Sequence, residues 1–304
     1  MTTSPPTAPG DQQAAAPEAD PPAREVVVGV EGTEVGLGAV RWAAREAIRR
    51  NAPLRIIHAA PYLEHGGSAD EPHPALPRAR RIIAQAYTVA LHTDHGIRAT
   101  TELVTDDPAT ALLRAGGGAQ LVVLGISTTG AADELVLASV AVRVAARSVQ
   151  PVVVVPRQRP GTAADRSAVA VLGVGDRADD EAVATFAAEA AERYGVGLTV
   201  LQTRNPDNSG PESWVDDPDQ WQRRYPGLTV SRTDLPAARA DQLMGASCPA
   251  PLMVISAGSG SLLHRTLDGP HRWLLRHCTS PMALLPPEHR REQQERREEV
   301  VALV

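Results

Sequence analysis

The 304-residue sequence contains no lysine, so all 30 of its basic residues are arginine. Without a primary amine on any side chain, the protein cannot form a Schiff base, use a lysine as general base or hold a phosphate with the lysine of a Walker A loop. Codon bias in a GC-rich bacterial genome is the favoured interpretation of this absence, and the chemical exclusions hold whatever its cause.

Cysteine and aromatic residues are also scarce. Cys248 and Cys278 have no metal-ligand spacing and make no disulfide framework, which favours a reduced, cytoplasmic location. Aromatic residues make up 3% of the chain, so Val, Leu, Ile and Ala must fill the core. This composition suits an α/β layered fold.

Long apolar runs and an excess of basic charge are missing too. No uninterrupted apolar run reaches membrane-spanning length, and the first residues lack the basic and apolar regions of a secretory signal. The formal net charge is −6, so no field that would attract nucleic acid is expected. We therefore expect neither a nucleic acid nor a membrane as partner.

Between two polar tails the chain repeats itself. The stretch VGVEGTEVGLGAVRWAAREAIRRNAPLRIIHA from Val28 aligns without a gap with LGVGDRADDEAVATFAAEAAERYGVGLTVLQT from Leu172, and Trp42 falls opposite Phe186, both interpreted as core residues. Later, LVVLG matches LMVIS and PVVVVP matches PMALLP. Such a match over each half indicates duplicated domains. We expect a disordered tail over 1–23, domains over 24–157 and 168–287, a linker over 158–167 and a charged tail over 288–304.

Each half alternates apolar strands with amphipathic helical stretches. In the first half the predicted strands are EVVVGV, LRIIHA, RATTELVT, LVVLG and PVVVVP. A first helix is predicted after the first strand, from the apolar or small residues at Val40, Ala43, Ala44, Ala47 and Ile48. A second, RRIIAQAYTVALHTDHG, ends near Gly96, and a third, DDPATALLRAGGG, has an aspartate cap and a proline in its first turn. A fourth is predicted over the Val136 to Arg147 region, with its N-terminus near Ser139. This alternation predicts a parallel sheet covered on both faces, with ligand sites beyond the carboxyl ends of the strands.

The chain resembles a tandem universal stress protein over residues 24–157 and 168–287. The resemblance rests on the opening VGVEGT, on WAAREAIRRNAPLRIIHA, on the loop after LVVLG and on the terminal PVVVVP strand, in that order and seen twice. It implies two doubly wound parallel five-stranded sheets of the adenine-nucleotide α-hydrolase-like kind, with strand order 3-2-1-4-5. It also implies ATP as the ligand, bound through an acid after the first strand and a loop of pattern G-x-x-G-x9-G-(S/T).

In the first half that resemblance selects a candidate site. The acidic position carries Glu31, and the loop pattern falls on Gly125, Thr128, Ala138 and Ser139, so that two of its glycines are replaced. A Cβ at positions 128 and 138 would narrow the approach to phosphate, whereas the hydroxyls and Gly130 would favour binding. The full set of expected cofactor-binding residues is Glu31, Gly32, Thr33, Gly125, Thr128, Gly130, Ala138, Ser139 and Val140.

The second half departs further from the pattern. Gly175 occupies the acidic position, and Pro270, which has no backbone N–H, occupies the position of the hydroxyl residue.

Other polar residues are candidates for metal or base contacts. His92, Asp94 and His95 cluster at a predicted helix end, where a solvated terminus is favoured over a metal site. His58 ends the second strand as either a base-ring contact or a satisfied core histidine. No catalytic constellation stands out, and no metal site is predicted.

We therefore expect a non-catalytic stress-response protein with a paired α/β scaffold and weak or lost nucleotide binding. The alternative is an ATP-binding sensor or slow ATPase that uses the first-half pocket; a metabolic enzyme of the wider group comes third. The halves are expected to pair along their last strands, as an intramolecular pseudo-dimer, with a homodimer of chains and the identity of protein partners left open.

Overall fold

The computed structural model describes residues 24–63, 73–126, 132–157, 168–172, 177–204, 221, 223–236, 250–257 and 279–287. The expected tails at 1–23 and 288–304 and the expected linker at 158–167 lie outside this range. The first half contains β1 (Val26–Gly29), α1 (Glu34–Arg49), β2 (Leu54–Ala59), the 3-10 helix η1 (Pro61–Leu63), α2 (Leu76–Thr93), β3 (Ala99–Val104), α3 (Pro108–Gly116), β4 (Leu121–Ile126), α4 (Ala132–Arg147) and β5 (Val152–Pro156). The second half contains β6 (Ala168–Leu172), α5 (Arg177–Tyr194), β7 (Gly197–Arg204), β8 (Val230–Pro236), β9 (Met253–Ser256) and β10 (Met282–Leu285).

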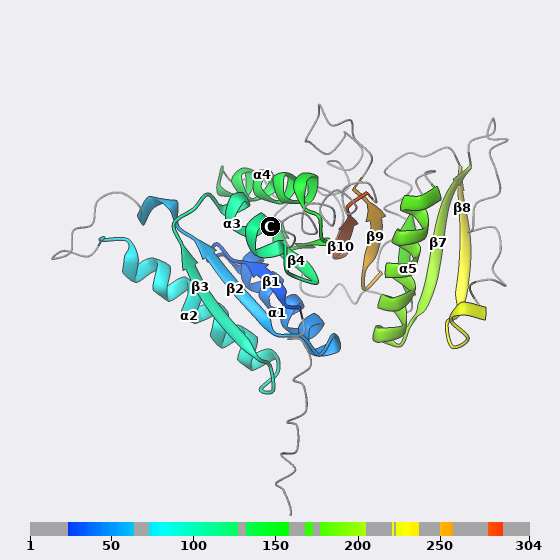
Figure 1. Ribbon diagram of the computed structural model, residues 1–304, viewed down its shortest axis with the longest axis horizontal. Coiled ribbons are helices and arrows are strands. Elements are labelled where there is room, and N and C mark those ends of the chain that lie inside the picture. Colours follow the sequence, from blue (N-terminus) through cyan, green and yellow to red (C-terminus); the bar gives the residue numbers. More distant parts are fainter. Residues whose placement is uncertain are drawn as a thin grey trace, which may run out of the picture.

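The strands form one continuous sheet in the order β3-β2-β1-β4-β5-β10-β9-β6-β7-β8 (Figure 1). The first five strands have the expected order 3-2-1-4-5, and the second half repeats that order in mirror direction. All neighbouring strands are parallel except β5 and β10, which pair antiparallel with Val153 opposite Ala283. The expected join along the last strands is thus confirmed, and the two expected sheets are the halves of a single ten-stranded one.

Two apolar layers cover this sheet. On one face α1, α2 and α5 pack in a core cluster that runs through both halves, from Val26 to Leu285, and that includes Trp42 as expected, while Phe186 packs partly buried against it. On the other face α3 and α4 pack against the opposite sides of the same strands (Figure 1). Since the first layer is continuous across the β5–β10 seam, burial of apolar surface itself holds the two halves together.

Two helix boundaries differ from the sequence prediction. Helix α2 begins at Leu76 and ends at Thr93, slightly before the expected end near Gly96. Helix α4 begins at Ala132, so the expected start near Ser139 is wrong. The physical reason is that the sequence from Ala132 to Arg147 contains no glycine or proline and is rich in residues of high helix propensity.

The helix α3 agrees with its predicted start. Asp107 is its N-cap and accepts a hydrogen bond from the backbone N–H of Thr110, and Pro108 occupies the first helical position.

Among the described helices, none is long and apolar enough to cross a membrane.

Candidate functional site

The turn between β1 and α1 holds the acidic residue of the expected site. The Glu31 carboxylate accepts hydrogen bonds from the Thr33 hydroxyl and, at 3.1 Å, from the backbone N–H of Gly36. Thr33 is the N-cap of α1, and its own oxygen lies 3.3 Å from the same N–H. Burial raises the pKa of Glu31, and the hydrogen bonds from Thr33 and Gly36 offset part of that rise. Glu31 therefore accepts a hydrogen bond from one of the free backbone N–H groups at the N-terminus of α1, the helix that follows it.

This arrangement depends on a glycine in the first turn of α1. A Cβ on Gly36 would collide with the carboxylate of Glu31. The absence of a side chain at position 36 is thus what lets the acid fold back onto the helix end.

Two glycines of the expected site, Gly32 and Gly125, pack closely against neighbouring helices. Gly32 has a φ of +94°, which favours glycine, and a Cβ there would lie 2.7 Å from Cγ1 of Ile82 on α2. Gly125, near the end of β4, faces the first turn of α1, where a Cβ would lie 3.0 Å from the carbonyl oxygen of Val35. Both glycines allow helices to approach the strand ends closely, which explains them without a ligand.

The phosphate side of the expected site is described in part. Thr128 and Gly130 lie outside the described residues. Ala138 and Ser139 lie within α4, several residues after its start at Ala132, and Val140 is 8% exposed and packs in the core. Because only the first four residues of a helix have free N–H groups, the expectation that Ser139 marks a helix N-terminus is wrong.

His58 is a buried histidine at the end of β2 with both ring nitrogens engaged. Its Nδ1 lies 2.8 Å from the carbonyl oxygen of Val30, so Nδ1 carries the proton, and Nε2 accepts from the hydroxyl of Tyr62 at 3.3 Å. Burial lowers the pKa of His58. The geometry matches the satisfied core histidine rather than a free side chain for a base ring.

Two of the three polar residues at the end of α2, His92 and Asp94, have hydrogen-bond partners within the chain. His92 Nδ1 lies 2.8 Å from the carbonyl oxygen of Thr88, and Asp94 accepts from the N–H of Gly96 at 2.7 Å. The described residues contain no group of three or more His, Cys, Asp or Glu side chains placed to hold a metal ion. In the second half, Gly175 and Pro270 lie outside the described residues.

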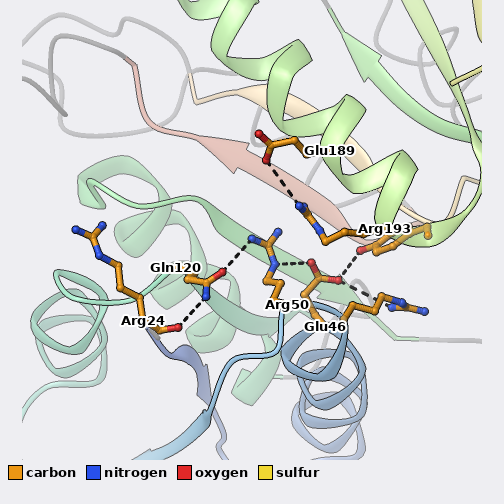
Figure 2. Close-up of polar contacts among 8 residues, drawn as sticks. Arg24, Glu46, Arg50, Gln120, Glu189 and Arg193 are labelled. Carbon is orange, nitrogen blue, oxygen red and sulfur yellow. Dashed lines mark hydrogen bonds and ion pairs between the residues drawn. The ribbon is translucent and has the colours of Figure 1, made fainter. Parts of the chain in front are cut away.

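Sequence reasoning missed a polar cluster at the seam between the halves. Glu46 of α1 is only 1% exposed and accepts hydrogen bonds from Nε of Arg50 at 2.6 Å and from the hydroxyl of Tyr194 on α5 at 2.8 Å (Figure 2). Arg50 also reaches Gln120 at 3.5 Å. The signal in the sequence was a glutamate on the apolar stripe of α1, three residues after Ala43 and one before Ala47.

Comparison with known proteins agrees with this architecture. Residues 22–156 match the family described as the Universal stress protein family. A universal stress protein of Mycolicibacterium smegmatis is 27% identical over 86% of this chain and 97% of its own length, and one of Mycobacterium tuberculosis is 29% identical over 84% and 95%.

A solved universal stress protein structure from Archaeoglobus fulgidus superposes with a TM-score of 0.64 at 11% identity, covering 87% of this chain and 97% of that one, so it shares the fold. The two relatives align with this chain along nearly their whole length, and the aligned part of this chain includes both of its repeats. The first half of the chain therefore matches the universal stress protein family, and relatives of that name align with both repeated halves.

Proposed function

We propose that the protein is a non-catalytic stress-response scaffold in which the nucleotide site of the first repeat is weak or lost. The stress-response role is supported by the similarity of the chain to universal stress proteins. The observation that carries the proposal is the commitment of Glu31, whose carboxylate caps α1 through Thr33 and Gly36. A ligand that used this acid would have to break those hydrogen bonds, each of which stabilises the folded state by roughly 0.5–3 kcal/mol.

The phosphate side supports the same proposal. Thr128 and Ala138 carry a Cβ where the family pattern has glycine. Ser139 lies inside α4 rather than at its start, so its backbone N–H belongs to the helical ladder. Free N–H groups at a helix start are what makes such a terminus attractive to phosphate.

The absence of catalysis is supported by four groups that have shifted pKa values and structural partners. Burial shifts the pKa of Glu31, His58 and Tyr194, whereas a hydrogen bond from Arg143 lowers that of Asp107. Each of the four bonds to another group of the protein and serves a cap, a strand end or the seam. Structural networks of this kind shift pKa values without any role in chemistry.

The domain organisation is part of the proposal. The ten-stranded sheet supports a first domain over 24–157 and a degenerate second domain over 168–287, joined by a linker at 158–167. The scarcity of cysteine supports a cytoplasmic setting. The proposed scaffold would present the rigid sheet and its helices to protein partners.

The competing function is an ATP-binding sensor or slow ATPase that uses the first repeat. Gly125 at the end of β4 and the acid after β1 favour it, because both stand where the family pattern has them. In that case ATP would displace Glu31 from the cap and approach the start of α4.

Calorimetric titration with ATP and Mg²⁺ separates these functions. We expect the wild type to bind no more tightly than about micromolar. The double substitution Thr128→Gly with Ala138→Gly should tighten binding if steric hindrance is the fault, whereas Ser139→Ala should change nothing. Thr88→Ala, on the exposed face of α2, is the matched control.

Submicromolar binding to the wild type that Ser139→Ala weakens about tenfold or more, while Thr88→Ala does not, would establish the sensor and overturn the proposal. Steady release of phosphate by the wild type, lost in the same variant, would show an ATPase.

A further inference from the structure

The C-terminal ends of α1 and α5 meet at the seam between the repeats, and both carry arginine (Figure 2). The alignment that pairs Val30 with Val174 also pairs Arg49 with Arg193. The internal repeat thus brings equivalent cationic helix ends to one place, with Arg50 beside them as the C-cap of α1.

Positive charge exceeds negative charge in this cluster. Arg49 and Arg50 lie 3.9 Å and 2.6 Å from the buried carboxylate of Glu46, and Arg193 is near enough to interact with it electrostatically. Glu189 is half exposed and lies 3.7 Å from Nη1 of Arg193, longer than a hydrogen bond. Among the described residues, the buried part of the seam therefore has a single carboxylate, that of Glu46, to compensate more than one arginine.

Several donors of these arginines have no acceptor. Nη2 of Arg50 and both Nε and Nη2 of Arg193 are buried and find no hydrogen-bond partner within the described part of the chain. The side chain of Arg50 is only 10% exposed. Burial and the nearby charge of Arg50 lower the pKa of Arg193, which means that the two cations repel one another. Unpaired buried donors of this kind are costly.

Neighbouring groups offset only part of this cost. The guanidinium of Arg49 stacks 4.5 Å over the ring of Tyr194, and that of Arg50 lies 5.4 Å from the ring centre of Phe186. Stacking uses the face of a guanidinium and leaves its N–H edge unbonded. The carbonyl ends of the two helices favour cations but do not supply acceptors to these three N–H groups.

We propose that the seam binds a small oxyanion, which bridges the N–H edges of Arg50 and Arg193 and so links the two repeats. Guanidinium forks match the paired oxygens of phosphate, sulfate or carboxylate and bind them with charge-assisted hydrogen bonds. The site is separate from the candidate nucleotide site, since it lies at the C-terminal ends of α1 and α5 rather than beyond β1 and β4.

Thermal unfolding of the full chain tests the site with inorganic phosphate against chloride at matched ionic strength, with sulfate and acetate as further probes. Wild-type protein should melt at a higher temperature in phosphate, and the shift should saturate with concentration. Arg193→Gln should weaken the apparent phosphate affinity about tenfold or more. In chloride the same variant should melt no lower than wild type, because the repulsion with Arg50 is relieved.

The matched control is Arg224→Gln, which removes an exposed arginine that lies 3.6 Å from Glu181. It should leave the phosphate shift unchanged. A second variant, Glu46→Gln, removes the buried negative charge and should tighten phosphate binding severalfold. The pattern across sulfate and acetate decides which oxyanion geometry the seam prefers.

The site is refuted if phosphate does not stabilise the wild type, if Arg193→Gln keeps the full shift, or if Arg224→Gln loses it equally. Should Arg193→Gln fail to fold, Glu46→Gln decides, and weaker phosphate binding in that variant would overturn the proposal. These results do not depend on ATP binding, so they leave the proposed function of the first repeat to its own titration.

Discussion

Replacing Tyr194 with phenylalanine removes the hydroxyl that donates from α5 to the buried Glu46 of α1, while the ring stays in place to stack with Arg49. A hydrogen bond to a charged group contributes about 1.5–3 kcal/mol. The Tyr194→Phe variant should therefore lose about that much free energy of unfolding, a change of roughly ten- to a hundredfold in the folding equilibrium.

Urea unfolding followed by circular dichroism measures this loss, and the midpoint should fall without a change in the slope m. Tyr87→Phe, on the outer face of α2 where Tyr87 is 37% exposed, is the matched control and should stay within about 0.5 kcal/mol of wild type. A double-mutant cycle with Glu46→Gln should give a coupling of about 0.5–3 kcal/mol. A loss of less than about 0.5 kcal/mol in the free energy of unfolding for Tyr194→Phe, or no coupling with Glu46→Gln, would refute the claim that the Tyr194–Glu46 hydrogen bond stabilises the contact between the halves.

Three further variants test the first repeat. Gly32→Ala should lower the free energy of unfolding by about 1–3 kcal/mol in urea titrations because its φ is +94°, whereas Gly38→Ala, with open space at its Cβ position, should be neutral or stabilising. Burial lowers the pKa of His58 below 6.5, so the unfolded chain binds a proton more readily than the folded chain. Stability should therefore fall as the pH drops below 6.5, and His58→Gln should flatten this fall in pH-dependent melting curves. Asp107→Ala should cost about 0.5–2 kcal/mol near neutral pH, and this cost should vanish in acid-unfolding curves as the pH falls below 3.8 through the lowered pKa of Asp107.

The sheet could be predicted from the sequence because its strands are continuous apolar runs. VVVG of β1 and LVVLGI of β4 are buried along their whole length, which only a sheet covered on both faces explains. The repeated PVVVVP and PMALLP strands likewise indicated how the halves join, since flanking prolines limit pairing to the central residues.

The start of α4 could not be predicted in the same way. Small and hydroxyl residues from Gly125 onward suggested a long loop, but Ala132, Asp133 and Glu134 begin the helix early. Helix propensity outweighed the resemblance to a phosphate loop, and this moved Ser139 away from the helix start.

The contacts of Glu31 and of the seam cluster depend on the folded chain. The cap on α1 exists because Gly36 leaves room for the carboxylate, a contact that spacing alone does not reveal. The Tyr194–Glu46 hydrogen bond joins residues 148 positions apart, and only the β5–β10 pairing brings their helices together.

Native mass spectrometry of the protein purified without added nucleotide tests the proposed function most directly. If Glu31 is committed to its own helix, the mass should be that of the polypeptide, with no stoichiometric adenine nucleotide attached. A full equivalent of ATP, ADP or AMP that remains bound through purification, and that is lost in Gly125→Val but kept in Gly38→Ala, would contradict a weak or lost site in the first repeat.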